Sequence, residues 1–180
     1  MVKRYKAIFL DRDGTLIKSI KKTNTKTKTR PPYKKSELHI FNDIKFLKKY
    51  EKKYYFFIVT NQPDIKRGLQ TNEFDNYINE QLKKKIKIRE IFSCKCLKID
   101  RNCKCYKPNI FMLLKAKRKY RIDFEKSFMI GDTWRDIKMG NDCMCKTILI
   151  ERNKLKTKKI IYRYKPNFKI KTFKELTKIL

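Results

Sequence analysis

Short, uninterrupted apolar segments alternate along this chain with segments whose apolar residues recur at helical spacing. The apolar segments that predict strands are residues 5–10, 54–59, 90–93, 127–130 and 147–150. Strands that are apolar throughout, rather than at every second position, are buried on both faces, as in a parallel sheet covered by helices. We therefore predict an α/β, Rossmann-like fold with a parallel sheet and helices on both of its faces.

The segments between these strands carry the capping residues and the apolar spacing of helices. Asn42 is expected to cap a helix that buries Ile44, Leu47 and Tyr50, and Thr71 is expected to cap a second one. Further helices are expected after residue 108, over residues 134–141 and from about residue 172. Helices in these places supply the long crossover connections that parallel strands require.

The length of the chain limits its domain organisation. A chain of 180 residues can bury one hydrophobic core but is short for two. It has no run of about 18 apolar residues, and its first residues lack the apolar stretch and cleavage site of a secretory signal. We expect a single domain over residues 1–180 that is monomeric, cytoplasmic and not bound to a membrane.

The charge balance is extreme, because 49 Lys and Arg residues face 18 Asp and Glu residues, for a formal net charge of +31. Much of the excess lies in residues 18–35, with eight basic and no acidic residues, and in residues 152–180, with eleven and one. We expect the first segment to be a flexible basic loop and the second a basic C-terminal extension. The positive charge attracts polyanions. Lys far outnumbers Arg, however, and proteins that recognise phosphate groups favour the guanidinium group of Arg. Nucleic-acid binding is therefore an open prediction and not the favoured one.

Polar side chains follow three of the predicted strands at the point where each strand ends. Asp11 and Asp13 follow the first strand, Thr60 and Asn61 the second, and Asp132 the strand over residues 127–130. Ligands of open parallel sheets bind at the carboxyl ends of the strands. The sequence therefore predicts one crevice that contains three carboxylates, a hydroxyl and an amide.

Three carboxylates in one crevice repel one another unless a cation lies among them, and oxygen ligands favour Mg²⁺. The pair Asp11 and Asp13 suits phosphoryl transfer, in which one carboxylate attacks phosphorus and the other handles the proton of the leaving oxygen. Lys107 can supply positive charge to the phosphoryl oxygens in the transition state. Each of these signals is weak alone, and their order at the strand ends makes them specific.

With these motifs the chain resembles the haloacid dehalogenase (HAD) superfamily of aspartate-nucleophile phosphatases. The matching segments are residues 8–16, Val59-Thr60-Asn61-Gln62, Lys107-Pro108, and Ile130-Gly131-Asp132 with Asp136. The resemblance implies that Asp11 is the nucleophile, which forms an aspartyl-phosphate, and that Asp13 is the general acid and base. It also implies that Mg²⁺ binds to Asp11, to Asp132 and to the backbone carbonyl of Asp13. Thr60, Asn61 and Lys107 would hold the phosphoryl group. Asp136 would support the site by orienting Lys107 or a metal ligand.

Four of the six cysteines form two Cys-x-Cys pairs just before Lys107. Cys94, Cys96, Cys103 and Cys105 have a spacing that can close a tetrahedral zinc site on the loop over residues 94–105. Disulfides are the competing interpretation, and nothing in the sequence indicates an oxidising compartment. We assign no role to the two remaining cysteines, Cys143 and Cys145.

The cysteine loop narrows the resemblance to the zinc-containing D-glycero-D-manno-heptose 1,7-bisphosphate phosphatases and the related histidinol-phosphate phosphatases. That group carries Cys-x-His in the first zinc pair and Arg before Lys-Pro, where this chain has Cys96 and Tyr106. The group has no large cap domain, and this chain has no room for one. The resemblance implies a Mg²⁺-dependent, zinc-containing phosphatase that hydrolyses a small phosphorylated metabolite, first of all a sugar bisphosphate of the heptose type. Tyr106 thus stands where the group has the Arg that would bind the distal phosphate through two hydrogen bonds.

Other functions remain open at the level of the sequence. Histidinol phosphate and the 3′-phosphate end of a nucleic acid are alternative substrates, the latter because of the positive charge. A non-catalytic polyanion-binding module is the alternative of another class. The one histidine, His39, lies in an apolar stretch and is interpreted as structural, which leaves no histidine nucleophile.

Overall fold

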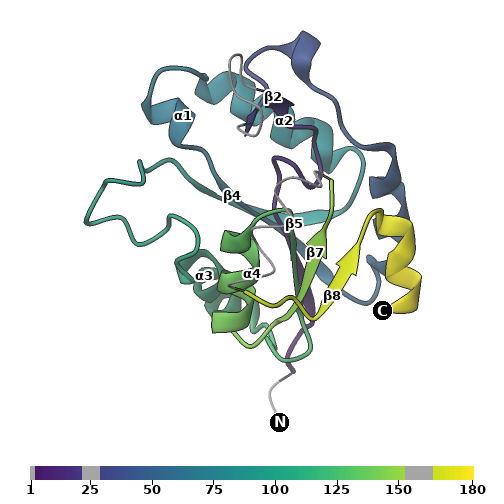
Figure 1. Ribbon diagram of the computed structural model, residues 1–180. Coiled ribbons are helices and arrows are strands. Elements are labelled where there is room, and N and C mark those ends of the chain that lie inside the picture. Colours follow the sequence, from purple (N-terminus) through teal and green to yellow (C-terminus); the bar gives the residue numbers. More distant parts are fainter. Residues whose placement is uncertain (1–2, 22–28, 153–163) are drawn as a thin grey trace.

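A computed structural model describes residues 3–21, 29–152 and 164–180 of the chain. Its centre is a six-stranded sheet in the order β5-β4-β1-β6-β7-β8, in which every neighbouring pair is parallel (Figure 1). The strands are β1 (Ala7–Leu10), β4 (Tyr55–Asn61), β5 (Ile88–Cys94), β6 (Phe128–Gly131), β7 (Lys146–Ile150) and β8 (Phe168–Ile170). The predicted parallel sheet is confirmed, and so are the five strands expected from the apolar segments.

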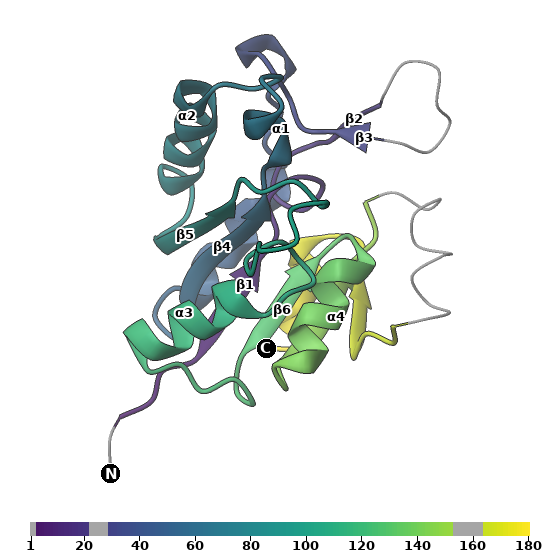
Figure 2. The same ribbon diagram turned by 90° about the vertical axis from the view of Figure 1, so that its left-hand side faces the viewer.

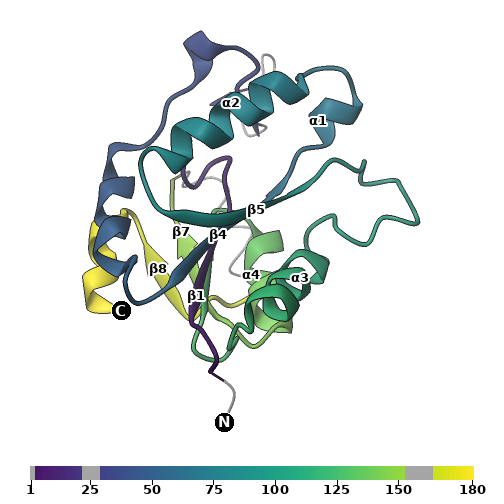
Figure 3. The same ribbon diagram turned by 180° about the vertical axis from the view of Figure 1, so that it is seen from behind.

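Helices cover both faces of the sheet. Consecutive strand residues point to opposite sides, and in β1 the side chains on both sides are apolar and buried. On one face, Ile8 and Leu10 of β1 share a core with the helices α2 (Asn72–Lys83), η2 (Asn42–Tyr50) and η3 (Phe173–Lys178). On the other face, Ala7 and Phe9 pack with α3 (Phe111–Tyr120) and α4 (Trp134–Asp142). Figure 3 shows α2 crossing the strands on the side opposite to α4. The two apolar layers fix the middle of the sheet, so that its strand ends hold side chains in defined positions.

Two helix starts test the predicted capping residues. Thr71 is the N-cap of α2, and its hydroxyl accepts a hydrogen bond from the backbone N–H of Phe74 at 3.1 Å, as predicted. The expected cap Asn42 is wrong, because Asn42 is the first residue of η2 and Phe41 precedes it without a side-chain cap bond. The segment is also a 3₁₀ helix rather than an α-helix. It still buries Ile44, Leu47 and Tyr50, as the apolar spacing predicted.

The described ends of the predicted basic loop over residues 18–35 contain regular structure that the sequence analysis did not predict. The strands β2 (Ile20–Lys21) and β3 (Thr29–Arg30) pair antiparallel, and a short 3₁₀ helix, η1 (Lys35–Glu37), follows them. Residues 22–28 of this segment lie outside the described residues. Within the basic C-terminal segment, residues 153–163 also lie outside them, whereas the last residues add β8 to the sheet and η3 to one face.

The carboxyl end of the sheet is framed by three short connections. The β2–β3 hairpin and the helix α1 (Pro63–Lys66) lie beyond the ends of β1 and β4 (Figure 2). The connection between β5 and α3 extends away from the sheet as a loop (Figures 1 and 3). None of these connections is a large cap domain. Among the described residues, no helix is both long enough and apolar enough to cross a bilayer.

Candidate active site

The segment that leaves β1 brings Asp11 and Asp13 to the carboxyl end of the sheet. The backbone N–H of Asp11 donates to the carbonyl of Ile130 at 2.9 Å, which extends the β1–β6 pairing as far as Asp11. Gly14 has a φ of 100°, and a Cβ at this position would overlap the Asp132 carboxylate. A residue with a side chain at position 14 would therefore be strained and would displace Asp132. Glycine at this turn lets the first loop approach the carboxylate that follows β6.

Lys107 lies between two of the predicted carboxylates and is buried with them. Its ammonium donates to Asp11 Oδ1 at 2.5 Å, to Asp136 Oδ1 at 2.7 Å and to the backbone carbonyl of Val59 at 3.0 Å. The exposed fraction is 4% for Lys107, 6% for Asp11 and 0% for Asp136. All three donor positions of the ammonium are used, so its place relative to the Asp11 carboxylate is fixed.

Asn61 holds the backbone of Lys107. Its Oδ1 accepts from the Lys107 backbone N–H at 2.9 Å, and its Nδ2 donates to the Lys107 carbonyl at 3.4 Å. The sequence analysis expected Asn61 to bind the phosphoryl group directly, whereas its side chain here anchors the lysine that would do so. This paired contact ties the end of β4 to the cysteine loop.

Asp132 and Asp136 complete a group of buried carboxylates with Asp11, since one ligand oxygen from each lies within 4.8 Å of the others. Asp136 is already committed: its Oδ2 accepts from the backbone N–H and the hydroxyl of Thr133 at 3.1 and 2.6 Å, and its Oδ1 accepts from Lys107. The geometry thus favours the predicted role in which Asp136 orients Lys107. Asp11 and Asp132 remain as the carboxylates that are suited to a cation.

The electrostatics of this group fit a divalent cation. Burial, together with the nearby carboxylates of Asp136 and Asp132, raises the pKa of Asp11 to about 8, in spite of the opposing Lys107 ammonium. Although burial opposes it, the attraction of Asp11 and Asp136 holds the pKa of Lys107 above its usual value. Carboxylate oxygens that lie close together in a buried place suit Mg²⁺, with Asp11 and Asp132 as its side-chain ligands.

Asp13 is held apart from that group by donors of its own. Its Oδ2 accepts from Gln62 Nε2 at 2.5 Å, from Arg12 Nε at 3.2 Å and from the hydroxyl of Thr60 at 3.4 Å. Thr60 therefore contacts the predicted general acid in this structure. Sequence reasoning assigned no role to Arg12 or Gln62, although both stand inside the motifs that it singled out. The position of Arg12 between the two predicted catalytic carboxylates was a signal that could have singled it out.

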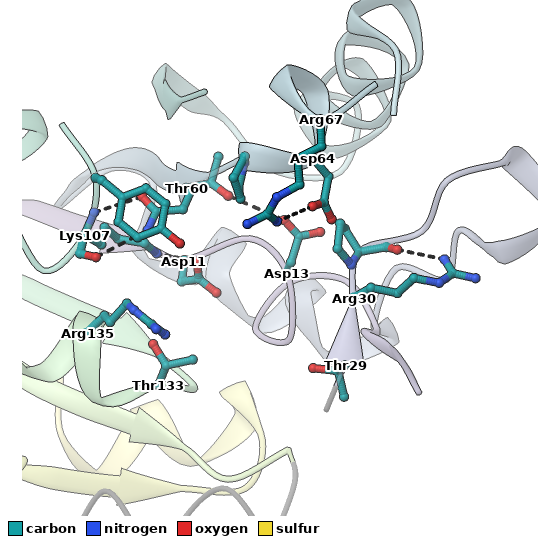
Figure 4. Close-up of a pocket in the computed structure, with 14 residues that line it drawn as sticks. Asp11, Asp13, Thr29, Arg30, Thr60, Asp64, Arg67, Lys107, Thr133 and Arg135 are labelled. Carbon is teal, nitrogen blue, oxygen red and sulfur yellow. Dashed lines mark hydrogen bonds and ion pairs between the residues drawn. The ribbon is translucent and has the colours of Figure 1, made fainter. Parts of the chain in front are cut away.

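A cavity of about 230 Å³ connects these residues to the hairpin and to α1 (Figure 4). It is lined by Asp11, Asp13, Thr60, Asn61 and Lys107, and also by side chains that the sequence analysis did not single out, namely Thr29, Arg30, Pro31, Pro63, Asp64, Arg67, Thr133 and Arg135, together with Tyr106. All the predicted catalytic and phosphate-binding side chains therefore line one cavity. The predicted metal ligand Asp132 and the supporting Asp136 are not among its lining residues. The sequence could not reveal the arginines, because Arg30 comes from the hairpin, Arg67 follows the end of α1 and Arg135 lies in the first turn of α4, and these positions depend on the fold.

The cations around the cavity differ in how far they are neutralised. Arg30 makes a two-pronged pair with Glu37 at 2.8 and 2.9 Å, and Arg67 pairs with Asp64 at 2.7 Å. Arg135 stacks over the ring of Trp134, 4.9 Å from its centroid, and forms no ion pair with any described residue. An anion that enters this cavity therefore meets one guanidinium whose charge is not already neutralised.

The four cysteines of the predicted zinc loop come together beside the site. Their sulfurs lie within 4.8 Å of one another, and three of the separations are 3.6 Å (Cys94 to Cys103), 3.7 Å (Cys96 to Cys105) and 3.5 Å (Cys103 to Cys105). A disulfide joins Cys94 to Cys105. Four thiolates around zinc at about 2.3 Å would be separated by about 3.8 Å, close to the three values above. The arrangement therefore accommodates both interpretations that the sequence left open.

The remaining candidates lie away from the cavity. His39 is exposed and contacts the ring of Phe41 edge to face, at 6.0 Å between centroids. Cys143 and Cys145 are buried in the core on the α3–α4 face, where burial raises the pKa of Cys143 to about 12. A thiol with such a pKa is not a reactive nucleophile. No role for these three residues follows from their positions.

The parallel sheet and the aspartate pair that follows its first strand are typical of one class of protein, the α/β phosphoryl-transfer enzymes. The comparisons agree with this class. A family model described as HAD-hydrolase-like matches residues 104–176. In a search of solved structures, D,D-heptose 1,7-bisphosphate phosphatase from B. bronchiseptica, complexed with magnesium and phosphate, superposes with a TM-score of 0.78 at 19% identity and covers 97% of this chain and 99% of its own. That likeness establishes the fold.

Relatives of higher sequence identity narrow the class. D-glycero-beta-D-manno-heptose-1,7-bisphosphate 7-phosphatase of Helicobacter pylori J99 is 31% identical over 164 residues, which are 87% of this chain and 90% of the relative. D-glycero-alpha-D-manno-heptose-1,7-bisphosphate 7-phosphatase of Campylobacter jejuni is 34% identical over 152 residues, or 81% of each chain. The chain belongs to the heptose-1,7-bisphosphate 7-phosphatase family of HAD-like hydrolases. It is thus an enzyme of the phosphatase class, as the resemblance in its motifs predicted.

Proposed function

We propose that this enzyme hydrolyses a phosphate monoester through an aspartyl-phosphate on Asp11. In the first step an Asp11 oxygen attacks phosphorus while Asp13 gives a proton to the departing ester oxygen. In the second step Asp13 takes a proton from water, which attacks phosphorus and releases phosphate from Asp11. Lys107 offsets the charge of the phosphoryl oxygens, and Asp136 holds Lys107 in place. Mg²⁺ on Asp11, Asp132 and the backbone carbonyl of Asp13 would supply further positive charge to the same oxygens.

One observation carries this proposal: the buried Lys107 ammonium bridges Asp11 and Asp136, with Asp132 alongside. Such a buried group of charges is costly in a protein that has no use for it. The test is Asp11→Asn, which has nearly the same shape but no nucleophilic carboxylate. It should abolish phosphate release from p-nitrophenyl phosphate and leave the far-UV circular dichroism unchanged. Undiminished turnover in this variant would refute the mechanism.

The proposed substrate is a D-glycero-D-manno-heptose 1,7-bisphosphate, which the names of the relatives give as theirs. The Helicobacter relative is named for the beta anomer and the Campylobacter relative for the alpha anomer, so the anomer is a separate question for this chain. Measuring the rate of phosphate release from each anomer separately answers this question.

The distal phosphate of such a substrate needs a cation that this chain does not place before Lys107. Tyr106 stands there, and both Tyr106 and Arg135 line the cavity that holds Asp11. Arg135 has no carboxylate partner among the described residues, so binding a phosphate would not break an existing pair. We propose that Arg135 binds the distal phosphate in place of the missing arginine, since guanidinium groups match phosphate geometry well.

We propose that the cysteine loop holds one zinc ion through Cys94, Cys96, Cys103 and Cys105. The three non-bonded sulfur separations support a tetrahedral site, and the loop leads directly into Lys107. Zinc there would be structural, because four protein ligands leave no open position. The disulfide between Cys94 and Cys105 is the alternative, and reductant and chelator distinguish the two: only the zinc site is sensitive to a chelator.

A second candidate substrate, the 3′-phosphate end of a nucleic acid, is favoured by the net charge of +31. It would show hydrolysis that weakens steeply with salt, because binding releases counterions from the nucleic acid and added salt makes that release less favourable. Histidinol phosphate is the other small-molecule candidate. A panel of heptose bisphosphate, histidinol phosphate and a 3′-phosphorylated oligonucleotide at two salt concentrations separates them.

We further propose that the chain acts as a single-domain monomer in the cytoplasm. The shared sheet and the continuous cores on its two faces support one domain over the described residues. Sedimentation equilibrium tests the oligomeric state.

A further inference from the structure

The carboxyl group of Asp13 is held asymmetrically. Its Oδ2 accepts three hydrogen bonds, from Gln62, Arg12 and Thr60, at 2.5, 3.2 and 3.4 Å. Its Oδ1 is buried and accepts none from the described residues. Asp13 lines the cavity together with Asp11 and Lys107, and its side chain is directed into the space that Figure 4 shows. One oxygen of the proposed acid is therefore held by three donors, and the other is buried without a hydrogen-bond partner among the described residues.

Arg12 is itself fixed by helix α2. It has no exposed surface, and its Nη1 donates to Asp75 Oδ1 at 2.6 Å and to Asn79 Oδ1 at 2.9 Å. Asp75 and Asn79 are buried as well, and Asn79 donates to Asp75 at 3.4 Å. Arg12 Nη2 has no hydrogen-bond partner among the described residues, so the bonds from Nη1 to helix α2 and from Nε to Asp13 are the ones that fix the guanidinium. Helix α2 thereby controls the orientation of a group at the end of β1.

Gln62 is the second residue that fixes the Asp13 carboxyl group. Its exposed fraction is 1%, and its Nε2 donates to both Asp13 Oδ2 and the hydroxyl of Thr60, the latter at 2.8 Å. An oxygen that accepts from three donors has no room for a proton of its own. In the neutral carboxyl group the hydrogen must then be on Oδ1.

We infer that Arg12 and Gln62, with Asp75 and Asn79 behind Arg12, are positioning residues that make Asp13 Oδ1 the oxygen that delivers the proton. As the bond from Asp11 to phosphorus forms and the ester bond breaks, the hydrogen on Oδ1 passes to the departing oxygen. The alcohol leaves neutral, and Asp13 becomes a carboxylate whose Oδ2 keeps its three donors. Without this hold the carboxyl group could turn and offer the wrong oxygen. The inference rests on the proposed function, in which Asp13 is the acid.

The test compares two leaving groups in single turnovers. A p-nitrophenolate departs readily without a proton, whereas a sugar alkoxide needs one, so only the second reaction depends strongly on the acid. Gln62→Met keeps the length of the side chain and removes the donor. It should lower the ratio of the sugar-phosphate rate constant to the p-nitrophenyl phosphate rate constant about 10- to 100-fold, part of the roughly 10²- to 10⁴-fold that an acid contributes.

Helix α2 offers a matched pair of variants that avoid the cavity. Asn79→Leu removes an acceptor of Arg12, and Asn76→Leu makes the same replacement on the exposed side of the same helix. Asn79→Leu should lower the ratio of the two rate constants at least about threefold, since misplacement of a catalytic group reduces the acid-dependent step selectively, while Asn76→Leu leaves it at the wild-type value. If Gln62→Met and Asn79→Leu slow both substrates by the same factor, or neither, the inference is overturned. Failure of the proposed function would appear separately, as retained turnover in Asp11→Asn.

Discussion

Replacing Asp136 by Asn tests the buried group of charges through stability as well as through activity. Asp136 has no exposed surface, and Lys107 has 4%. Removing one partner of a buried ion pair costs about 3–5 kcal/mol, because the remaining charge is left without full compensation. Asp11 stays beside Lys107, and the new amide still accepts one hydrogen bond, so we expect the lower end of this range, about 3 kcal/mol. For a chain of this size that corresponds to a decrease in the melting temperature of about 6–12 °C.

Helix α4 provides the control for this experiment. Asp142 pairs with Lys138 at 2.6 Å, but the two side chains are 40% and 34% exposed. An exposed pair on a helix contributes only about 0.3–0.5 kcal/mol, so Asp142→Asn should change stability by no more than that. Both variants remove one carboxylate from the same helix, and they differ mainly in burial. Urea unfolding followed by far-UV circular dichroism measures the free energy of unfolding of each.

The reasoning about the buried group would be refuted if Asp136→Asn destabilised the protein by less than about 1 kcal/mol, a value nearer to the exposed pairs than to buried ones. It would also be refuted if the two variants could not be distinguished. Turnover of p-nitrophenyl phosphate should fall in Asp136→Asn but not in Asp142→Asn, because only Asp136 holds Lys107 against Asp11.

Three further outcomes are expected. Arg135→Gln should raise KM for a heptose bisphosphate at least about 10-fold more than KM for the matching monophosphate, because a charge-assisted bond contributes about 1.5–3 kcal/mol; equal changes would show that Arg135 does not bind the distal phosphate. The bonds from Arg30 and the Tyr33 N–H lower the pKa of Glu37 to about 2 from 4.5, so the stability they add is present above about pH 4.5 and is lost as the pH falls toward 2; Glu37→Gln should therefore flatten the loss of stability over this window, and an unchanged slope in acid unfolding experiments would argue against the pair. Cys103→Ser should remove about one zinc per chain by elemental analysis and lower the melting temperature; a wild-type protein without zinc, insensitive to Cys103→Ser and destabilised by reductant, would favour the disulfide.

The sheet and the side chains gathered at its carboxyl end could be predicted because both follow from local sequence. The segment Ala7–Leu10 is apolar at every position, which is typical of a strand buried on both faces, and the polar residues after it had to lie at the sheet's carboxyl end. The same reasoning about strand ends placed Asp132 near Asp11, whereas Lys107 was predicted from the charge that phosphoryl transfer needs and from the resemblance in the motifs. The structure brings both close to Asp11.

The parts that could not be predicted depend on contacts between distant segments. The strands of the β2–β3 hairpin have two residues each and lie in a Lys- and Thr-rich segment without apolar periodicity. No sequence pattern therefore predicted them. Arg12 is an arginine with no exposed surface, and composition alone assigns arginine to the outside. Its partners are on α2, more than sixty residues later. The cysteine loop lies between these cases, since its spacing predicted that the four sulfurs come together but could not decide between zinc and a disulfide.

The most direct test of the catalytic account is to trap the covalent intermediate. The enzyme is mixed with p-nitrophenyl phosphate and Mg²⁺, quenched in acid within one turnover, digested and analysed by mass spectrometry. We predict a phosphate on the peptide that contains Asp11, and none in Asp11→Asn. Full turnover with no phosphorylated peptide at any quench time, or with the phosphate on another residue, would contradict nucleophilic attack by Asp11.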